Sequence, residues 1–470
     1  MRTLLINPPV PRTFYNREFY LPSGEMYLGA VLQRNNEEVR LIDLKTFQKE
    51  FLYETRGDPE NEDYDYIIKD AISKFKPDLI GFGGLISGNF LDVLKFSKVT
   101  KNSFPEIPVV MGGAHASMYP NEILTNCPSI DWLVLGEGED TLMQLIEKIE
   151  RKDYNFEDID GFAFRQDGRV VINPKTRFIR DLDSLPFPAY DLINLKAYFE
   201  DTSKWHNPKK LKMDMEIPII SSRSCPYDCN FCSEGEIMGK GWRPRSPKNV
   251  IDEIEFVYDR YHQSHFGFMD DNLTISKRRI IEICNEIKRR GLNIQFETHN
   301  GVSIRTLDKE ILESMVSAGL TRIALPIESG SDYIRNEIMG KRLSREKIFE
   351  TVKCLKKYEQ VYTRAFFIMG MPEETRETLE DTYKMIQEID VDRVHLTNIV
   401  PFPGSRVFEQ ALKDNLLVNL KPEELYLSDE MYQTNYHTYF IKPYQLELKD
   451  LREFRERCNN LIDGLNSRRR

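Results

Sequence analysis

The residues best suited to chemistry are three cysteines that stand close together in a chain of 470 residues. Cys225, Cys229 and Cys232 form a C-x3-C-x2-C pattern, with Phe231 directly before the last of them. Iron-sulfur clusters take cysteine thiolates as ligands, and four is the usual number. Three thiolates leave one iron open to a substrate or cofactor. The spacing therefore predicts a cluster with one exchangeable position.

Zinc and disulfide chemistry fit these cysteines less well. A structural zinc site needs a fourth ligand, and the sequence holds no second C-x2-C pair. Seven cysteines in so long a chain, three of them crowded together, suit a reducing compartment better than a disulfide framework. We therefore expect a cytoplasmic protein.

The region from residue 215 to residue 405 resembles the radical SAM superfamily. Beyond the cysteine pattern, the resemblance rests on four segments: Met269-Asp-Asp-Asn272, Ile327-Glu-Ser-Gly-Ser331, Ile368-Met-Gly-Met-Pro-Glu-Glu374 and Pro401-Phe-Pro-Gly404. It implies that the three cysteines hold a [4Fe-4S] cluster whose open iron is chelated by S-adenosylmethionine. It also implies reductive cleavage of that molecule to a 5′-deoxyadenosyl radical.

The same resemblance implies which residues contact S-adenosylmethionine. It places Asp270 and Asp271 near the methionyl amino group, Glu328 and Ser329 near the ribose and sulfonium, and Ile368 to Gly370 beside the adenine. Phe231 is counted with these cofactor contacts. Arg364 is a candidate partner of the methionyl carboxylate, because guanidinium groups pair with carboxylates; a surface arginine is the alternative.

Four polar residues are candidates for contact with the substrate: Glu234, Glu297, His299 and His395. Glu234 follows the cysteines, and the other three belong to predicted strands. Barrel enzymes place their active sites at the carboxyl ends of the strands. Structural polar residues also occur there, so a structural role is the alternative for each.

Two series of apolar runs must position these residues. Runs at 3–7, 39–43, 78–82, 108–111 and 131–135 alternate with helical segments, which predicts a Rossmann-like, doubly wound parallel sheet over residues 1–150. Six further runs between 217 and 397 predict a partial (β/α)6 TIM-type barrel over residues 215–405. Residues 151–214 read as a connector with a β-hairpin, turned at Asp167-Gly168, and residues 406–470 as a small, mainly helical segment.

Residues 1–150 resemble the cobalamin-binding domain of one radical SAM branch. This resemblance rests on Leu5-Ile-Asn-Pro-Pro9, Leu41-Ile-Asp43, Gly112-Gly-Ala-His115 and Gly136-Glu-Gly-Glu139. It implies cobalamin contacts at Gly112, Gly113, Gly136, Glu137 and Gly138. A vestigial or purely structural domain is the alternative, and the glycines also suit ordinary tight turns. A nicotinamide or flavin cofactor is disfavoured, because the first strand is followed by prolines and not by G-x-G-x-x-G.

The D-x-H-x-x-G motif, whose histidine ligates cobalt in cobalamin mutases, is absent. His115 is interpreted as a loop histidine because its context does not match that motif. We therefore expect the lower face of cobalamin to meet the loop from Leu85 to Ser87 without a histidine bond.

The leading functional prediction is cobalamin-dependent methylation of an unactivated carbon in a small molecule. The alternative is a non-methylating radical reaction such as oxidative cyclisation, ring contraction or dehydration, and a noncatalytic scaffold would leave the S-adenosylmethionine motifs unexplained. An external donor such as flavodoxin or ferredoxin is expected as the electron source. The net charge of -10 argues against nucleic acid as a partner, and no apolar run is long enough for a membrane span.

Overall fold

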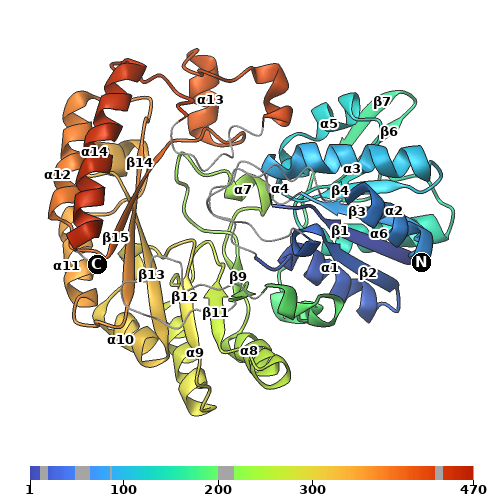
Figure 1. Cartoon of the computed structure of the whole chain (residues 1–470), viewed down its shortest axis with the longest axis horizontal. Coiled ribbons are helices and arrows are strands. Elements are labelled where there is room, and N and C mark those ends of the chain that lie inside the picture. Colours follow the sequence, from blue (N-terminus) through green and yellow to red (C-terminus); the bar gives the residue numbers. More distant parts are fainter. Residues whose placement is uncertain (11–19, 48–63, 85–86, 199–215, 429–437, 469–470) are drawn as a thin grey trace.

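Two sheets, built mainly of parallel strands, organise the chain (Figure 1). The computed structural model describes residues 1–10, 20–47, 64–84, 87–198, 216–428 and 438–468. The predicted α/β class with parallel sheets is confirmed. Within the described ranges, no helix is both long enough and apolar enough to cross a membrane.

The first sheet contains β1 (Arg2–Asn7), β2 (Glu38–Asp43), β3 (Leu79–Gly83), β4 (Val109–Gly112), β5 (Trp132–Val134), β6 (Phe162–Gln166) and β7 (Arg169–Asn173). Its helices are α1 (Ser23–Arg34), α2 (Tyr64–Phe75), α3 (Phe90–Ser103), α4 (Ala114–Met118), α5 (Pro120–Asn126) and α6 (Glu139–Glu150). The strand order is β2-β1-β3-β4-β5-β6-β7, and β1 to β5 pair in parallel.

Both faces of the first sheet are covered by helices. Leu5 of β1 belongs to the core that includes residues of α1 and α6. Its neighbours Leu4 and Ile6 belong to a second core with residues of α2, α3 and α5. Successive side chains of a strand point to opposite faces, so a continuous apolar run suits a strand buried on both sides.

The predicted hairpin exists, but it is part of the first sheet. β6 and β7 pair antiparallel around Asp167 and Gly168, both of which have positive φ. β6 also pairs antiparallel with β5, so the hairpin covers an edge that β5 would otherwise expose. This pairing could not be predicted, because turn chemistry identifies a hairpin and not the strand beside it.

The second sheet contains β8 (Ile217–Ile219), β11 (His265–Phe268), β12 (Gln295–Thr298), β13 (Leu320–Glu328), β14 (Tyr362–Met369) and β15 (Arg393–Asn398), all parallel and in chain order. Its connecting helices are α8 (Pro247–Tyr261), α9 (Lys277–Arg289), α10 (Lys309–Ser317), α11 (Arg345–Leu355) and α12 (Arg376–Glu388). Each of these helices begins after a side chain that accepts a hydrogen bond from the first turn: Ser246, Ser276, Asp308, Ser344 and Thr375.

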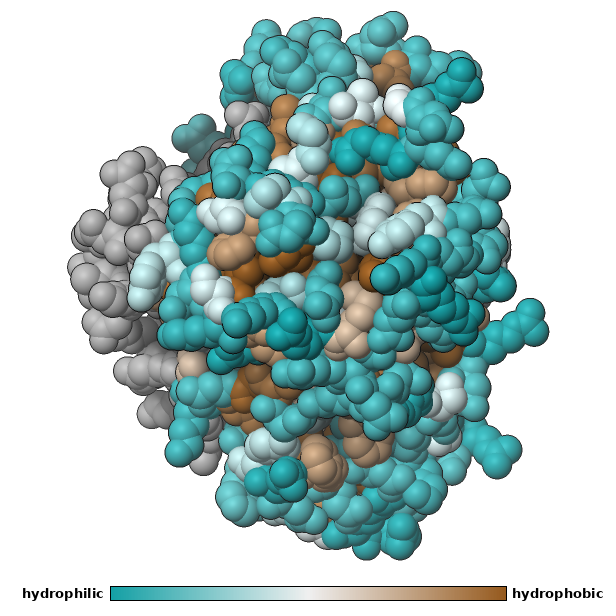
Figure 2. Space-filling model, turned by 90° about the vertical axis from the view of Figure 1, so that its right-hand side faces the viewer, coloured by the Kyte–Doolittle hydropathy of each residue, from teal (hydrophilic) through white to brown (hydrophobic). Residues whose placement is uncertain are grey.

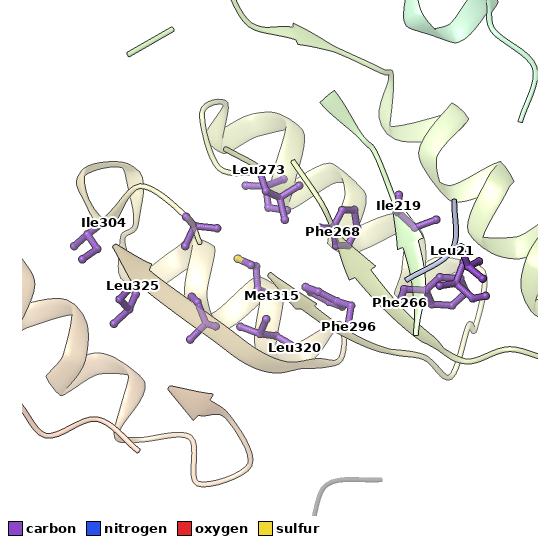
Figure 3. Close-up of a cluster of buried hydrophobic side chains, with 14 of the residues drawn as sticks. Leu21, Ile219, Phe266, Phe268, Leu273, Phe296, Ile304, Met315, Leu320 and Leu325 are labelled. Carbon is purple, nitrogen blue, oxygen red and sulfur yellow. The ribbon is translucent and has the colours of Figure 1, made fainter. Parts of the chain in front are cut away.

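The two faces of the second sheet carry different side chains. Phe266, Phe268 and Phe296 point to the side of the helices and share a core with Leu273, Met315, Leu320 and Leu325 (Figure 3). The alternate strand positions point to the opposite face, which we call the inner face. Polar side chains stand at these positions: His265, Glu297, Arg364 and His395.

The C-terminal segment joins the two sheets. It contains α13 (Arg406–Lys413), the 3-10 helix η10 (Pro422–Leu427) and α14 (Leu448–Arg468). Phe408, Tyr426 and Phe440 lie in the core beneath α2 and α3 of the first sheet. Leu451 and Phe454 of α14 pack in the core of the second sheet. The predicted helical segment is thus present, and it holds the two halves together.

The side of the molecule formed by the first sheet presents a mainly hydrophilic surface. Figure 2 shows this surface with hydrophobic side chains visible in several separate areas between hydrophilic ones. The apolar side chains of the first sheet are instead gathered in its two cores.

Candidate functional site

The three cysteines lie on the loop that follows β9 (Ser222–Arg223), at the carboxyl end of β8. Cys225 and Cys229 are half-buried and Cys232 is exposed, and none forms a disulfide. Ser224 begins the loop with a positive φ, and its hydroxyl donates to the Gly239 carbonyl. The loop therefore leaves the sheet sharply, and its three thiols stay available as ligands.

Contacts from distant parts of the chain fix this loop. The amide of Asn230 donates to Met339, beyond the π-helix η9 (Tyr333–Ile338), at 3.2 Å. Its carbonyl accepts from Val407 of α13 at 3.0 Å. Asp228 forms an ion pair with Arg406 at 2.9 Å. The cysteine loop is thereby tied to the second sheet and to the C-terminal segment.

A buried ion pair stands beside the cysteines. Lys341 Nζ lies 2.9 Å from Glu328 Oε1 and 5.9 Å from the centre of the Phe231 ring. Burial lowers the pKa of Lys341, but the charges of Glu328 and Cys229 outweigh burial and raise it. Glu328 ends β13 with a φ of 69°, a conformation that non-glycine residues rarely adopt and that often marks functional sites. A positive charge here suits a site that gathers three thiolates.

Asp270 hydrogen-bonds two serines that come shortly before the cysteines. Its carboxylate accepts hydrogen bonds from the Ser221 amide at 3.1 Å, from the Ser221 hydroxyl at 2.7 Å and from the Ser222 hydroxyl. These bonds fix the chain between β8 and β9, directly before the cysteines. The predicted contact with the methionyl amino group stays a prediction for Asp270.

Asp271 and Glu234 form a carboxyl pair next to the cysteine loop. Glu234 begins the short helix α7 (Glu234–Ile237), and its side chain hydrogen-bonds Asp271. Burial and the neighbouring carboxylate raise the pKa of Glu234 to about 8, and burial and Asp270 raise the pKa of Asp271 to about 6. The sequence assigned these residues to different roles, whereas the structure brings them together.

The predicted adenine segment turns at the end of β14. Gly370 has a φ of 93°, and its amide donates to the fully buried carboxyl of Glu374. Burial raises the pKa of Glu374 to about 8, so this group is predominantly neutral at pH 7. Ile368 contacts the apolar cluster around Ile334, Met371 and Ile399, which Phe231 also contacts. Ser329 is fully buried beside Thr382, 3.2 Å away through the two hydroxyls.

Three predicted substrate contacts and Arg364 lie on the inner face. Glu297 is buried, and burial raises its pKa, but a hydrogen bond from His265 and the positive charges nearby hold that pKa at about 2. His299 bonds Glu216 at 2.5 Å, and this carboxylate raises the pKa of His299 against the effect of burial. His395 meets the Phe366 ring edge to face at 5.4 Å.

Arg364 lies five positions before the end of β14. Its Nε and Nη2 atoms are buried and have no hydrogen-bond partner within the described part of the chain. Its charge weakly opposes the rise in the pKa of His299 that Glu216 causes. The structure therefore groups Arg364 with the inner-face residues, and its contact with S-adenosylmethionine stays a prediction.

The glycines at the end of β4 and those that follow β5 differ in what lies next to them. Gly112 and Gly113 close β4, and Gly113 has a φ of 104°, so a bare backbone ends the strand. A Cβ on Gly136 would lie 2.9 Å from the Ile237 carbonyl, so this glycine allows α7 to approach. Gly138 packs near Leu28 and Val134. Gly112 and Gly113 thus fit close contact with a large ligand better than Gly136 does.

Glu137 connects the first sheet to β9, the strand directly before the cysteine loop. Its Oε1 accepts from Arg223 Nη1 at 2.9 Å and from Arg243 Nη1 at 2.6 Å, and its Oε2 accepts from the Ile179 amide at 2.8 Å. Glu139 accepts from Arg223 Nη2 at 2.6 Å. Both oxygens of Glu137 are thus engaged by protein groups, and its contact with cobalamin stays a prediction.

The interpretation of His115 as a loop histidine is wrong. It lies in α4, is fully buried, and packs against the tilted rings of Phe90 and Tyr119, with ring centres 4.3 and 4.9 Å away. It hydrogen-bonds the backbone of Tyr426, yet burial lowers the pKa of His115 to about 3. Leu85 and the side chain of Ser87 lie outside the described residues, so the predicted lower face of cobalamin stays a prediction.

The donor chemistry fits the expected groups. Three free thiols on one loop, with the ammonium of Lys341 nearby, suit a thiolate-bound cluster. The bare backbone at Gly112 and Gly113 suits a large ring. The imidazole of His115 is fully buried and hydrogen-bonds the backbone of Tyr426, and the absence of a histidine bond to cobalamin stays a prediction.

Several residues of the site escaped the sequence patterns: Glu216, Arg223, Arg243, His265 and Lys341. Most of them meet their partners far along the chain, such as Arg223 and Glu137, which are 86 positions apart, whereas Lys341 and Glu328 are 13 positions apart. Arg223 has one local signal, its place two residues before Cys225. The others stand in no motif.

Two family models match the chain. The model of the radical SAM superfamily matches residues 219–386, and that of the B12 binding domain matches residues 18–146. These two segments contain the cysteine loop and the first parallel sheet.

Individual proteins match over most of the chain. An uncharacterized methyltransferase of Pyrococcus horikoshii is 31% identical over 402 residues, which cover 85% of this chain and 80% of that protein. The cytidylyl-2-hydroxyethylphosphonate methyltransferase of Streptomyces wedmorensis is 26% identical and covers 90% and 83%. Among solved structures, the radical S-adenosylmethionine methyltransferase TsrM of Kitasatospora setae superposes with a TM-score of 0.73 at 17% identity, covering 98% and 89%.

Proposed function

Since the chain belongs to the radical SAM enzymes that carry a B12-binding domain, we propose that it is a cobalamin-dependent methyltransferase acting on an unactivated carbon of a small molecule. The names of its relatives support methyl transfer, because both the Pyrococcus and the Streptomyces protein are described as methyltransferases. When bound, the cluster, S-adenosylmethionine and cobalamin supply radical formation and a transferable methyl group.

The observation that carries this proposal is the direct link between the two cofactor regions. Arg223 stands two residues before Cys225 and binds both Glu137 and Glu139 of the first sheet. α7, which follows the cysteines, meets the backbone at Gly136. The carboxyl ends of both sheets are thereby brought together. Parallel α/β sheets bind their ligands at these ends, so a substrate between them would face both cofactors.

We propose that the second sheet is a partial (β/α)6 barrel and the first a Rossmann-like fold, with boundaries near residues 150, 214 and 405. Consecutive parallel pairing with helices on one face supports the barrel. Helices on both faces of the first sheet support the Rossmann-like fold. In this arrangement Cys225, Cys229 and Cys232 hold the cluster, and Gly112 and Gly113 lie against cobalamin.

The inner-face residues are the proposed substrate contacts. Glu297, His299 and His395 combine hydrogen-bonding and titratable groups on one face of the second sheet. Glu234 lies at the carboxyl end of the same strands, paired with Asp271. Their roles are to bind and orient polar groups of the substrate.

The proposal includes a one-electron donor of the flavodoxin or ferredoxin type, because the cluster must be reduced before each cleavage. The reducing compartment in which such donors occur also agrees with seven unpaired cysteines, and we infer a cytoplasmic location.

The first experiment is anaerobic reconstitution with iron, sulfide and cobalamin, followed by assay of 5′-deoxyadenosine. We expect its formation with reductant and S-adenosylmethionine, and a bound-cobalamin absorption spectrum. Cys232→Ala should abolish 5′-deoxyadenosine, whereas Cys354→Ala, a cysteine of α11, should behave as the wild type. Equal product from wild type and Cys232→Ala, or none from a fully reconstituted cluster, would contradict the proposal.

A further inference from the structure

Four side chains form a compact group on the inner face of the second sheet: Glu216, His265, Glu297 and His299, here called the inner cluster. Glu216 directly precedes β8, His265 begins β11, Glu297 lies in β12 and His299 directly follows that strand. Three neighbouring parallel strands thus deliver two imidazoles and two carboxylates to one place. The cysteines lie beyond the opposite, carboxyl end of β8.

The distances within the inner cluster suit a shared ion. His265 Nε2 lies 2.7 Å from Glu297 Oε1, and His299 Nε2 lies 2.5 Å from Glu216 Oε2 and 3.5 Å from Glu297 Oε2. The ligand atoms of Glu216, His265 and Glu297 all lie within 4.8 Å of one another. Donors about 2.1 Å from a tetrahedral zinc ion are about 3.4 Å apart, so small movements would close such a shell.

Burial and an unsatisfied carboxylate oxygen also favour a bound cation at the inner cluster. The side chains of Glu297 and His265 are only 1% and 8% exposed. Glu216 Oε1 is buried and accepts no hydrogen bond from any described residue. An unsatisfied buried carboxylate oxygen is costly, and a cation would satisfy it.

Gly267 makes the space for this arrangement. It pairs with Glu297 in the register of β11 and β12. A Cβ at this position would lie 1.4 Å from Glu216 Oε1 and 3.1 Å from His299 Cδ2. Any side chain here would displace the carboxylate, so the glycine allows Glu216 and His299 to approach.

We propose that Glu216, His265 and Glu297, with His299 as the fourth ligand, form a metal site for a divalent transition-metal ion such as Zn²⁺, separate from the cysteine site. Imidazole and carboxylate are ligands of zinc and related first-row ions, whereas Mg²⁺ and Ca²⁺ prefer oxygen alone. The two carboxylates neutralise the charge of the ion. It would join β8, β11 and β12 on the inner face. This inference refines the proposed function, because Glu297 and His299 would then act on the substrate through the bound ion and not directly.

Two arginines limit the affinity of the site. Arg322 Nη1 lies 3.5 Å from Glu297 Oε2, and the charge of Arg364 reaches His299. Positive charges beside a cation weaken its binding. Removing the charge of Arg364 should therefore tighten metal binding, a response opposite to that of removing a ligand.

The test uses the full-length chain with Cys225, Cys229 and Cys232 replaced by Ala, because free thiolates would bind zinc themselves. Zn²⁺ affinity is measured by competition with a chromophoric chelator, and stoichiometry by mass spectrometry of the metal. We expect one Zn²⁺ per chain. Glu216→Gln and His265→Gln should each weaken binding at least tenfold, and Arg364→Met should strengthen it. Glu286→Gln, at a half-buried position of α9 outside the inner cluster, should have no effect.

Either of two results would contradict the proposed metal site. If the cysteine-free chain binds no Zn²⁺, or if Glu216→Gln and His265→Gln bind it as tightly as Glu286→Gln, the inner cluster is a hydrogen-bonded network without a metal. Circular dichroism of each variant identifies those that fail to fold. The gain expected for Arg364→Met is a second test, since misfolding does not increase affinity.

Discussion

Single residues of the site show how burial changes chemistry. The same residue type behaves differently in different places: the pKa of Glu297 is held at about 2 by His265 and nearby charges, whereas that of Glu374 is raised by burial to about 8. Burial is the main cause at Glu374, and hydrogen bonds from the backbone amides of Gly370 and Met371 only partly oppose it. A neutral carboxyl therefore holds the turn that ends β14.

Two replacements of Glu374 should distinguish the role of its hydrogen-bond acceptor from the role of its charge. Glu374→Gln keeps an acceptor and removes no charge at pH 7, so we expect near wild-type binding of S-adenosylmethionine. Glu374→Ala leaves two buried amides without a partner, each at a cost of about 1–3 kcal/mol, and should weaken binding at least tenfold. Calorimetric titration of the reconstituted enzyme measures both. Equal loss in Gln and Ala would show that the ionised carboxylate matters.

His115 should make the protein sensitive to acid. Its pKa is about 3 in the folded chain and near 6.5 when exposed, so the unfolded chain binds a proton between these values that the folded chain does not. Stability is then fully present above pH 6.5 and falls as pH falls, by up to about 1.4 kcal/mol per pH unit.

The measurement is chemical unfolding at pH 7.5 and pH 5.5. His115→Phe should lose about 1 kcal/mol less than the wild type on acidification, because its ring does not titrate. His262→Asn, at the exposed end of α8, should respond to pH as the wild type does. The same acid response in wild type and His115→Phe would refute this role.

At the scale of elements, the strand β9 and the turn before α6 form the joint between the two sheets. Arg223 is buried and binds two buried glutamates, so removal of the guanidinium leaves two carboxylates without their partner. Such losses cost about 3–5 kcal/mol. An exposed pair such as Arg289 with Glu286 contributes about 1 kcal/mol or less.

Arg223→Ala should therefore lower the thermal midpoint by several degrees and reduce occupancy of both the cluster and cobalamin. Arg289→Ala should change neither. Differential scanning calorimetry and quantification of iron and cobalt decide the matter. If Arg223→Ala retains the wild-type midpoint, the joint does not depend on this ion pair.

At the scale of the whole molecule, short sequence patterns predict the elements that neighbouring residues form. Apolar runs located the strands of both sheets, Asp167-Gly168 located a hairpin, and the cysteine spacing located the loop that can hold a cluster. Contacts between distant segments left no such pattern: Glu216 meets His299 across 83 residues, and Tyr426 joins the core of the first sheet. The joint at Arg223, the inner cluster and the bridging C-terminal segment therefore required the structure.

Methyl transfer by this enzyme should depend on both cofactor regions. The most direct test is growth on methionine with a trideuterated methyl group, with mass spectrometric comparison of metabolites between cells that express the wild type and cells that express Cys232→Ala, both supplied with cobalamin. We predict a metabolite that carries the intact trideuteromethyl group only with the wild type, and that disappears when cobalamin is withheld. A product that depends on Cys232 but carries no label would contradict methyl transfer and favour a non-methylating radical reaction.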